Sequence, residues 1–233
     1  MSRGAPRLPL TPSQVAALLG AVQRAARAER EGRLPPIPER VLVELVRVLR
    51  AERAADGGPP TVREARRRMR RAAAVTGLAG LPGRVSAEAI ALVEQARAAV
   101  ALAERRGVAR DDAELAADLL VVWDLVDDRA RAEAITAGTA GRSLLDHEVA
   151  VGTDRLRDEL PDEWTPWSTL RFLWRLRRLR DAVPDALQPG VRSLPIVGAV
   201  PAALGAGREM KAFQKRLGRH LDAIAADARR SGA

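Results

Sequence analysis

The stretch PERVLVELVRVLRAER, residues 38–53, decides the fold class of this 233-residue chain. Its apolar side chains cover most of the circumference of a helix. Arg40, Glu44 and Arg47, at spacings of four and three residues, form its one polar stripe. A helix with such a wide apolar surface is stable only when most of it is buried against other elements. The stretch therefore predicts a largely buried helix.

The segments on both sides of this stretch carry the start and stop signals of further helices. Thr11 with Gln14 and Asp111 with Glu114 are spaced as capping boxes, and Gly107 is placed to end a helix. No segment of useful length shows the alternation of apolar and polar residues that marks a strand. The sequence therefore predicts an all-α, multi-helix bundle. Besides residues 38–53, helices are expected over residues 11–32, 61–75, 86–106, 111–126, 128–137, 143–160, 165–184 and 208–229.

Composition and charge exclude some classes of protein. The chain has no cysteine, so it forms no disulfide and uses no thiolate. It lacks a long apolar run and a signal-peptide pattern, so we expect a cytoplasmic protein without a transmembrane helix. The net charge of +9 divides into +11 for residues 1–110, −10 for residues 111–163 and +8 for residues 164–233. The acidic middle segment lies between two basic segments of the sequence. We therefore expect these opposite charges to neutralise one another inside one fold.

Three sequence pieces, in this order, resemble the EcsC family of bacterial proteins. They are TGLAGLPG at residues 76–83, AERRGVARDDAE at residues 103–114, and LPIVGA at residues 194–199, which precedes small residues and a basic helix. Pro201 departs from the family pattern. The resemblance covers roughly residues 72–221 and does not extend to the first 60 residues. We therefore expect an EcsC-like helical domain over residues 61–233, preceded by an N-terminal helical arm or extension over residues 1–60. The resemblance also implies a non-transmembrane protein linked to membrane transport or secretion, and it brings no catalytic residues.

The C-terminal region is the first candidate for a functional surface. Residues 194–207 are apolar and rich in small residues, which predicts a short apolar helical hairpin, and the following helix is basic and amphipathic. Such a pair suits an anionic membrane surface, because the apolar part enters the interface while cations meet the headgroups. The alternative is a buried core hairpin with a solvated outer face. The expected contact residues are Leu194, Ile196, Val197, Val200, Leu204, Lys211, Lys215, Arg216 and Arg219.

A second candidate lies in residues 164–180, where tryptophan and arginine alternate with leucine. Trp167 and Trp174 suit a membrane interface, where indole rings lie at headgroup depth. The leucines Leu170, Leu173 and Leu176 favour the alternative, a core helix whose arginines pair with the acidic middle segment.

The remaining polar clusters predict weaker functional sites. The arginines of residues 63–71 suit nucleic-acid or lipid phosphates, but arginine supplies 37 of the 39 basic residues of this chain, so a solvated face is also expected. Asp124, Asp127 and Asp128 could hold Mg²⁺ in an all-α enzyme, although Asp127 and Asp128 also suit a helix cap. The two histidines, His147 and His220, match no zinc motif.

The sequence as a whole predicts a non-enzymatic helical protein resembling EcsC, without cofactor or metal. Its expected partner is an anionic membrane surface or a membrane protein, at the cytoplasmic face of the inner membrane. An arginine-rich nucleic-acid-binding protein is the first alternative. A Mg²⁺-dependent all-α enzyme that uses Asp124, Asp127 and Asp128 is the second. The oligomeric state is not determined by the sequence.

Overall fold

The structure is a computed structural model, and it describes residues 10–27, 36–56, 87–146, 160–182 and 199–231. Within these ranges the chain forms helices, turns and loops and contains no strand, so the predicted all-α class is confirmed. The described helices are α1 (Pro12–Arg27), α2 (Ile37–Asp56), α4 (Ala87–Arg105), α5 (Asp112–Val122), α6 (Arg129–Ala137), α9 (Pro166–Ala182) and α10 (Ala199–Ser231).

Local hydrogen bonds begin several of these helices, as the sequence predicts. The amide of Thr11 donates to Gln14 Oε1 at 2.8 Å, and the amide of Gln14 donates to Thr11 Oγ1 at 3.3 Å. Asp111 and Glu114 form the same reciprocal box at the start of α5. Asp128 caps α6 by accepting from the amide of Arg131 at 2.8 Å. These bonds satisfy amide groups that the first turn of a helix leaves without partners.

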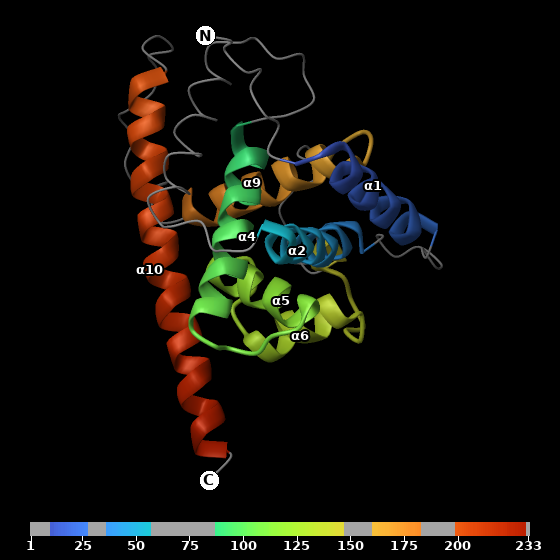
Figure 1. The fold of residues 1–233 in the computed structure, drawn as a ribbon. Coiled ribbons are helices and arrows are strands. Elements are labelled where there is room, and N and C mark those ends of the chain that lie inside the picture. The colour runs from blue at the N-terminus through green and yellow to red at the C-terminus, as the bar shows by residue number, and fades with distance from the viewer. Residues whose placement is uncertain (1–9, 28–35, 57–86, 147–159, 183–198, 232–233) are drawn as a thin grey trace.

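The core forms around α2 and α4. In α2 the residues Val41, Leu42, Leu45 and Val46 are fully buried, which confirms the prediction from residues 38–53. This helix packs against α1, α4, α5 and α9, and α4 packs in turn against α9 and α10 (Figure 1). Apolar residues of all the helices named above meet in one buried cluster, to which α6 contributes Ala132 and Ile135. The predicted boundary at residue 60 lies outside the described residues.

Two predicted helix boundaries were wrong. We expected the fifth helix to continue to residue 126, but α5 ends at Val122, because Asp124 has a φ of 62° and turns the chain toward α6. We expected the last helix to begin at Arg208, but α10 begins at Ala199 and runs through Pro201. Proline is tolerated there because the first turn of a helix has amide groups without intrahelical partners.

Other predictions fall on residues that the structure does not describe. The basic helix of residues 61–75 and the glycine-rich piece at residues 76–83 lie outside the described residues, as does most of the helix expected at residues 143–160. Of the predicted apolar hairpin, only the part from Ala199 onward is described, and it belongs to α10.

Candidate functional site

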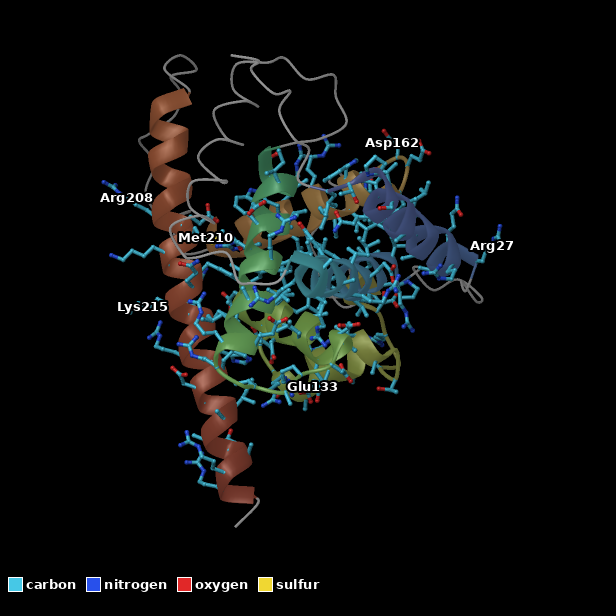
Figure 2. The ribbon with its side chains drawn as sticks, in the orientation of Figure 1. Arg27, Glu133, Asp162, Arg208, Met210 and Lys215 are labelled. Carbon is cyan, nitrogen blue, oxygen red and sulfur yellow. The ribbon has the colours of Figure 1, made fainter. Side chains whose placement is uncertain are left out.

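The outer face of α10 is the best candidate for a functional surface. This helix lies along one flank of the molecule, beside α4 and α5 (Figure 1). One side of it is buried against these two helices, and Met210 points toward them (Figure 2). The buried residues recur at helical spacing, as the sequence predicts, and they are Met210, Phe213, Leu217, Leu221 and Ile224. Because this side is buried, the opposite side faces outward along the helix.

Four cations line that outward side, and we call them the basic stripe: Arg208, Lys211, Lys215 and Arg219. All four are exposed, and their spacings of three and four residues place them on one face of the helix. Arg208 and Lys215 point away from the other helices (Figure 2). No ion pair joins any of the four to an acidic side chain within the described ranges. The two lysines of the stripe are the only lysines of the chain.

A buried polar cluster fixes α10 to α5. The carboxylate of Asp118 in α5 is fully buried and lies 2.9 Å from Nε2 of His220 in α10. Arg110 donates to both carboxylate oxygens, from Nε at 2.9 Å and from Nη2 at 3.2 Å. Arg110 also donates to Glu133 of α6 at 2.9 Å. Burial opposes ionisation of Asp118, but the hydrogen bonds from His220 and Arg110 outweigh it and hold the pKa of this carboxyl below its ordinary value of 3.8.

Two further ion pairs hold the helix on either side of this cluster. Arg106, in the turn after α4, places Nε 2.8 Å from Asp222 Oδ1, and its guanidinium lies against Gly218, where a side chain would collide with it. Toward the other end, the buried Arg177 of α9 lies 3.2 Å from Glu209. The basic stripe is therefore carried by a helix that is anchored at three places.

Arg177 belongs to a second buried polar group, at the centre of the bundle. Its Nη1 donates to Oε1 of Gln95 in α4 at 3.3 Å, and the same oxygen accepts from Nε1 of Trp123 at 2.7 Å. The guanidinium carbon also lies 5.3 Å from the ring centroid of Trp174, a cation–π arrangement. These contacts join α4, α9 and the end of α5.

The structure brings some of the predicted contact residues together on this surface. Lys211, Lys215 and Arg219 belong to the basic stripe, whereas Arg216 is half-buried on the flank of α10. Val200 and Leu204 lie in the first turns of α10, and their side chains are outside the description. Leu194, Ile196 and Val197 lie outside the described residues.

The predicted tryptophans do not belong to the basic stripe. Trp174 is 7% exposed and packs in the core, and Trp167 is half-buried against the core. Leu170, Leu173 and Leu176 are buried, so α9 is the core helix of the alternative prediction. The pairing of its arginines with the acidic middle segment stays a prediction, and the ion pair described for Arg177 joins it to Glu209 of α10.

The aspartates considered for Mg²⁺ do not form a metal site with other residues that the structure describes. Asp124, Asp127 and Asp128 are all exposed, and Asp128 caps α6. Among the residues that the structure describes, no group of three or more histidine, aspartate or glutamate side chains is placed to hold a metal ion. The arginines of residues 63–71 and His147 are outside the described ranges.

Sequence reasoning missed two features of this surface. Arg208 continues the spacing of Lys211, Lys215 and Arg219, so the helical period of the cations could have found it. The contact between Asp118 and His220 gave no comparable signal, because 102 positions separate the two residues.

Comparison of the chain with protein-family models, with curated proteins and with solved structures finds no match. The resemblance to the EcsC family therefore rests on the three quoted sequence pieces. In the described part of the chain, no helix combines the length and the apolar character needed to cross a membrane.

Proposed function

We propose that this chain is a non-enzymatic helical protein that associates with an anionic membrane surface through α10. The observation that carries the proposal is the basic stripe, in which four exposed cations on one helical face have no acidic partner among the described residues. Phosphate and carboxylate groups of anionic lipids would supply the missing counter-charges. Such a stripe on a firmly docked helix presents its cations together, at little cost in conformational entropy of the backbone.

The stripe alone supports weak, reversible binding. Each lysine or arginine near an anionic surface contributes about 1 kcal/mol, so the four cations supply about 4 kcal/mol. That corresponds to a partition ratio of roughly a thousand. Firm attachment requires a second, apolar contribution, because single weak anchors bind membranes only marginally.

The apolar residues at the start of α10 and just before it would supply that contribution. The apolar side from Met210 to Ile224 is committed to the core and is not free to enter lipid. Residues 194–207 precede this docked part, and α10 is already helical from Ala199. In this proposal the apolar residues 194–207 enter the headgroup region, those from Ala199 onward as the first turns of α10, while the stripe lies along the surface. The contact residues are then Leu194, Ile196, Val197, Val200 and Leu204, with the basic stripe.

The resemblance to EcsC gives this surface a cellular setting. In this proposal the protein acts at the cytoplasmic face of a bacterial membrane, beside a transporter or a secretion system, which is the setting that the resemblance implies. If the partner is such a membrane protein, its cytoplasmic surface should be acidic, because the basic stripe binds negative charge.

Flotation with lipid vesicles tests the proposal. Vesicles that contain phosphatidylserine or phosphatidylglycerol should carry the full chain upward in a density gradient, whereas pure phosphatidylcholine vesicles should not. The double variant Lys211→Glu/Lys215→Glu should bind at least about 30-fold more weakly, because two attractions of about 1 kcal/mol each are lost.

A variant with the same change in net charge provides the control. Arg131→Glu/Arg142→Glu alters two exposed arginines outside α10, and it should float like the wild type. Equal losses in the two double variants would show that total charge, not the stripe, controls binding. Absence of flotation of the wild type at low salt would remove the membrane proposal. Retention of duplex DNA near physiological salt would then favour the nucleic-acid alternative.

A further inference from the structure

Glu39 is a buried acidic residue that does not belong to the basic stripe. It belongs to the first turn of α2 and is 1% exposed. Its Oε1 accepts a hydrogen bond from the amide of Leu144 at 3.1 Å. Leu144 and Leu145 are fully buried, so this bond joins two segments of the core that lie 105 positions apart in the sequence.

The second carboxyl oxygen of Glu39 has no such partner. Oε2 is buried and accepts no hydrogen bond among the described residues. No lysine, arginine or histidine of the described ranges forms an ion pair with Glu39. An ionised carboxylate in this place would therefore be dehydrated and would hold a single amide donor from another segment, which does not compensate the loss of water.

The charged groups around Glu39 do not change this balance. Arg40, the next residue of α2, is exposed, and its guanidinium lies against Gly138 at the end of α6. Asp146, in the segment that begins at Leu144, accepts from the amide and hydroxyl of Ser143, each at 3.0 Å, and its negative charge repels an ionised Glu39. Burial is the largest influence and, with Asp146, it outweighs the amide bonds and Arg40, raising the pKa of Glu39 to about 7.

We propose that the protonation state of Glu39 controls the contact between the first turn of α2 and the segment Ser143–Asp146. As the neutral acid it is compatible with the closed, dry contact around Leu144. When it loses its proton, the contact opens and admits water to the carboxylate. The opening exposes Leu144 and Leu145 to water, so this part of the bundle loosens as the pH rises toward neutrality.

The sign and size of the effect follow from proton linkage. In the open state, water reaches Glu39 and its pKa returns toward the ordinary value of 4.5. Between pH 5 and pH 7 the open state therefore binds fewer protons than the closed state. Opening is therefore favoured as the pH rises from 4.5 to about 7, and the effect levels off above that range. The opening equilibrium constant should increase by about 50-fold between pH 5 and pH 7.5.

Amide hydrogen exchange of Leu144, Leu145 and Asp146 in the full chain, corrected for intrinsic exchange rates, measures this opening. The wild type should show the 50-fold increase. Glu39→Gln, which keeps an acceptor for the Leu144 amide and cannot ionise, should show little change with pH. The control Glu88→Gln alters a glutamate in the first turn of α4 and should keep the wild-type pH dependence. An unchanged pH dependence in Glu39→Gln would overturn the proposal.

A measurement on the wild type keeps the proposal testable if Glu39→Gln does not fold. Infrared spectroscopy of the chain labelled with carbon-13 glutamate should detect a protonated carboxyl group at pH 6 that disappears by pH 8.5. Ordinary glutamates are already ionised at pH 6. The absence of a protonated glutamate at pH 6 would also overturn the proposal.

Discussion

The imidazole Nε2 of His220 lies 2.9 Å from Oδ1 of Asp118, and this contact joins the last helix of the chain to α5. Asp118 is fully buried, and Arg110 binds it through two nitrogens. The contact fixes the rotation of α10 about its own axis, because His220 must face α5. That rotation decides which cations face outward, so this contact and the buried apolar side of α10 together determine where the basic stripe lies.

Removal of the Asp118 carboxylate should destabilise the bundle. Asp118→Ala leaves the guanidinium of Arg110, whose side chain is 5% exposed, without its main buried partner. Loss of one member of a buried ion pair costs about 3–5 kcal/mol. Urea unfolding followed by circular dichroism measures the free energy of unfolding. The exposed Asp162→Ala should change it by less than about 0.5 kcal/mol. A similar small effect for Asp118→Ala would show that the cluster contributes little to stability.

Acid should weaken the wild type through the same carboxyl. The pKa of Asp118 is lower in the folded chain than its ordinary value of 3.8, so the folded state binds fewer protons. The contribution of Asp118 is complete above about pH 4 and is lost as the pH falls through the folded-state pKa. The urea concentration at the midpoint of unfolding should decrease from pH 5 to pH 3, and this decrease should be larger for the wild type than for Asp118→Asn. Parallel decreases in the two proteins would assign acid sensitivity to other groups.

Docking of α10 should depend on the ring of Phe213, which is fully buried. Phe213→Ala removes a large core side chain and leaves a cavity, at a cost of about 3–5 kcal/mol. Lys215→Ala, two positions later on the exposed face, should cost less than about 0.5 kcal/mol. Chemical unfolding compares the two variants. Equal stabilities would mean that the buried side of α10 does not hold it to the bundle.

Gly138 should tolerate substitution less well than its neighbour in sequence Gly141. Gly138 ends α6 with a φ of 76°, and a side chain there would collide with the guanidinium of Arg40. Alanine in the left-handed region costs about 1–2 kcal/mol, so Gly138→Ala should lose at least that much stability. Gly141→Ala meets open space and has no positive φ, and its thermal midpoint should stay close to that of the wild type. The opposite order of the two midpoints would contradict the role of Gly138.

Charge, and not the identity of the side chain, should determine lipid binding by the basic stripe. Lys211→Arg/Lys215→Arg keeps both cations and should bind anionic vesicles like the wild type, whereas Lys211→Ala/Lys215→Ala should bind about 30-fold more weakly. Binding should also weaken strongly between about 0.1 M and 1 M salt, where the Debye length falls from about 10 Å to 3 Å. Binding that survives 1 M salt would indicate that the apolar residues before the stripe dominate.

Much of the helical framework could be predicted because its signals are local. The capping pairs Thr11–Gln14 and Asp111–Glu114 act within a single turn, and each lies where the spacing of the sequence placed it. The same holds for the buried side of α10, whose period of three and four residues is visible from Met210 onward. The end of α5 was predicted at residue 126, four residues beyond its end at Val122. The chain bends at Asp124, where no proline or glycine in the sequence indicates a helix end.

The sequence by itself determined the all-α class, most of the described helix starts and the division of α10 into an apolar and a basic side. These features depend on hydrogen bonds and side-chain spacing within a few residues of one helix. The tertiary structure decided that Trp174 lies in the core, that His220 meets Asp118 and that Glu39 is buried beside Leu144. Burial and buried ion pairs depend on which helices pack together. The contacting segments lie about a hundred residues apart, and no local sequence pattern indicates which of them will pack together.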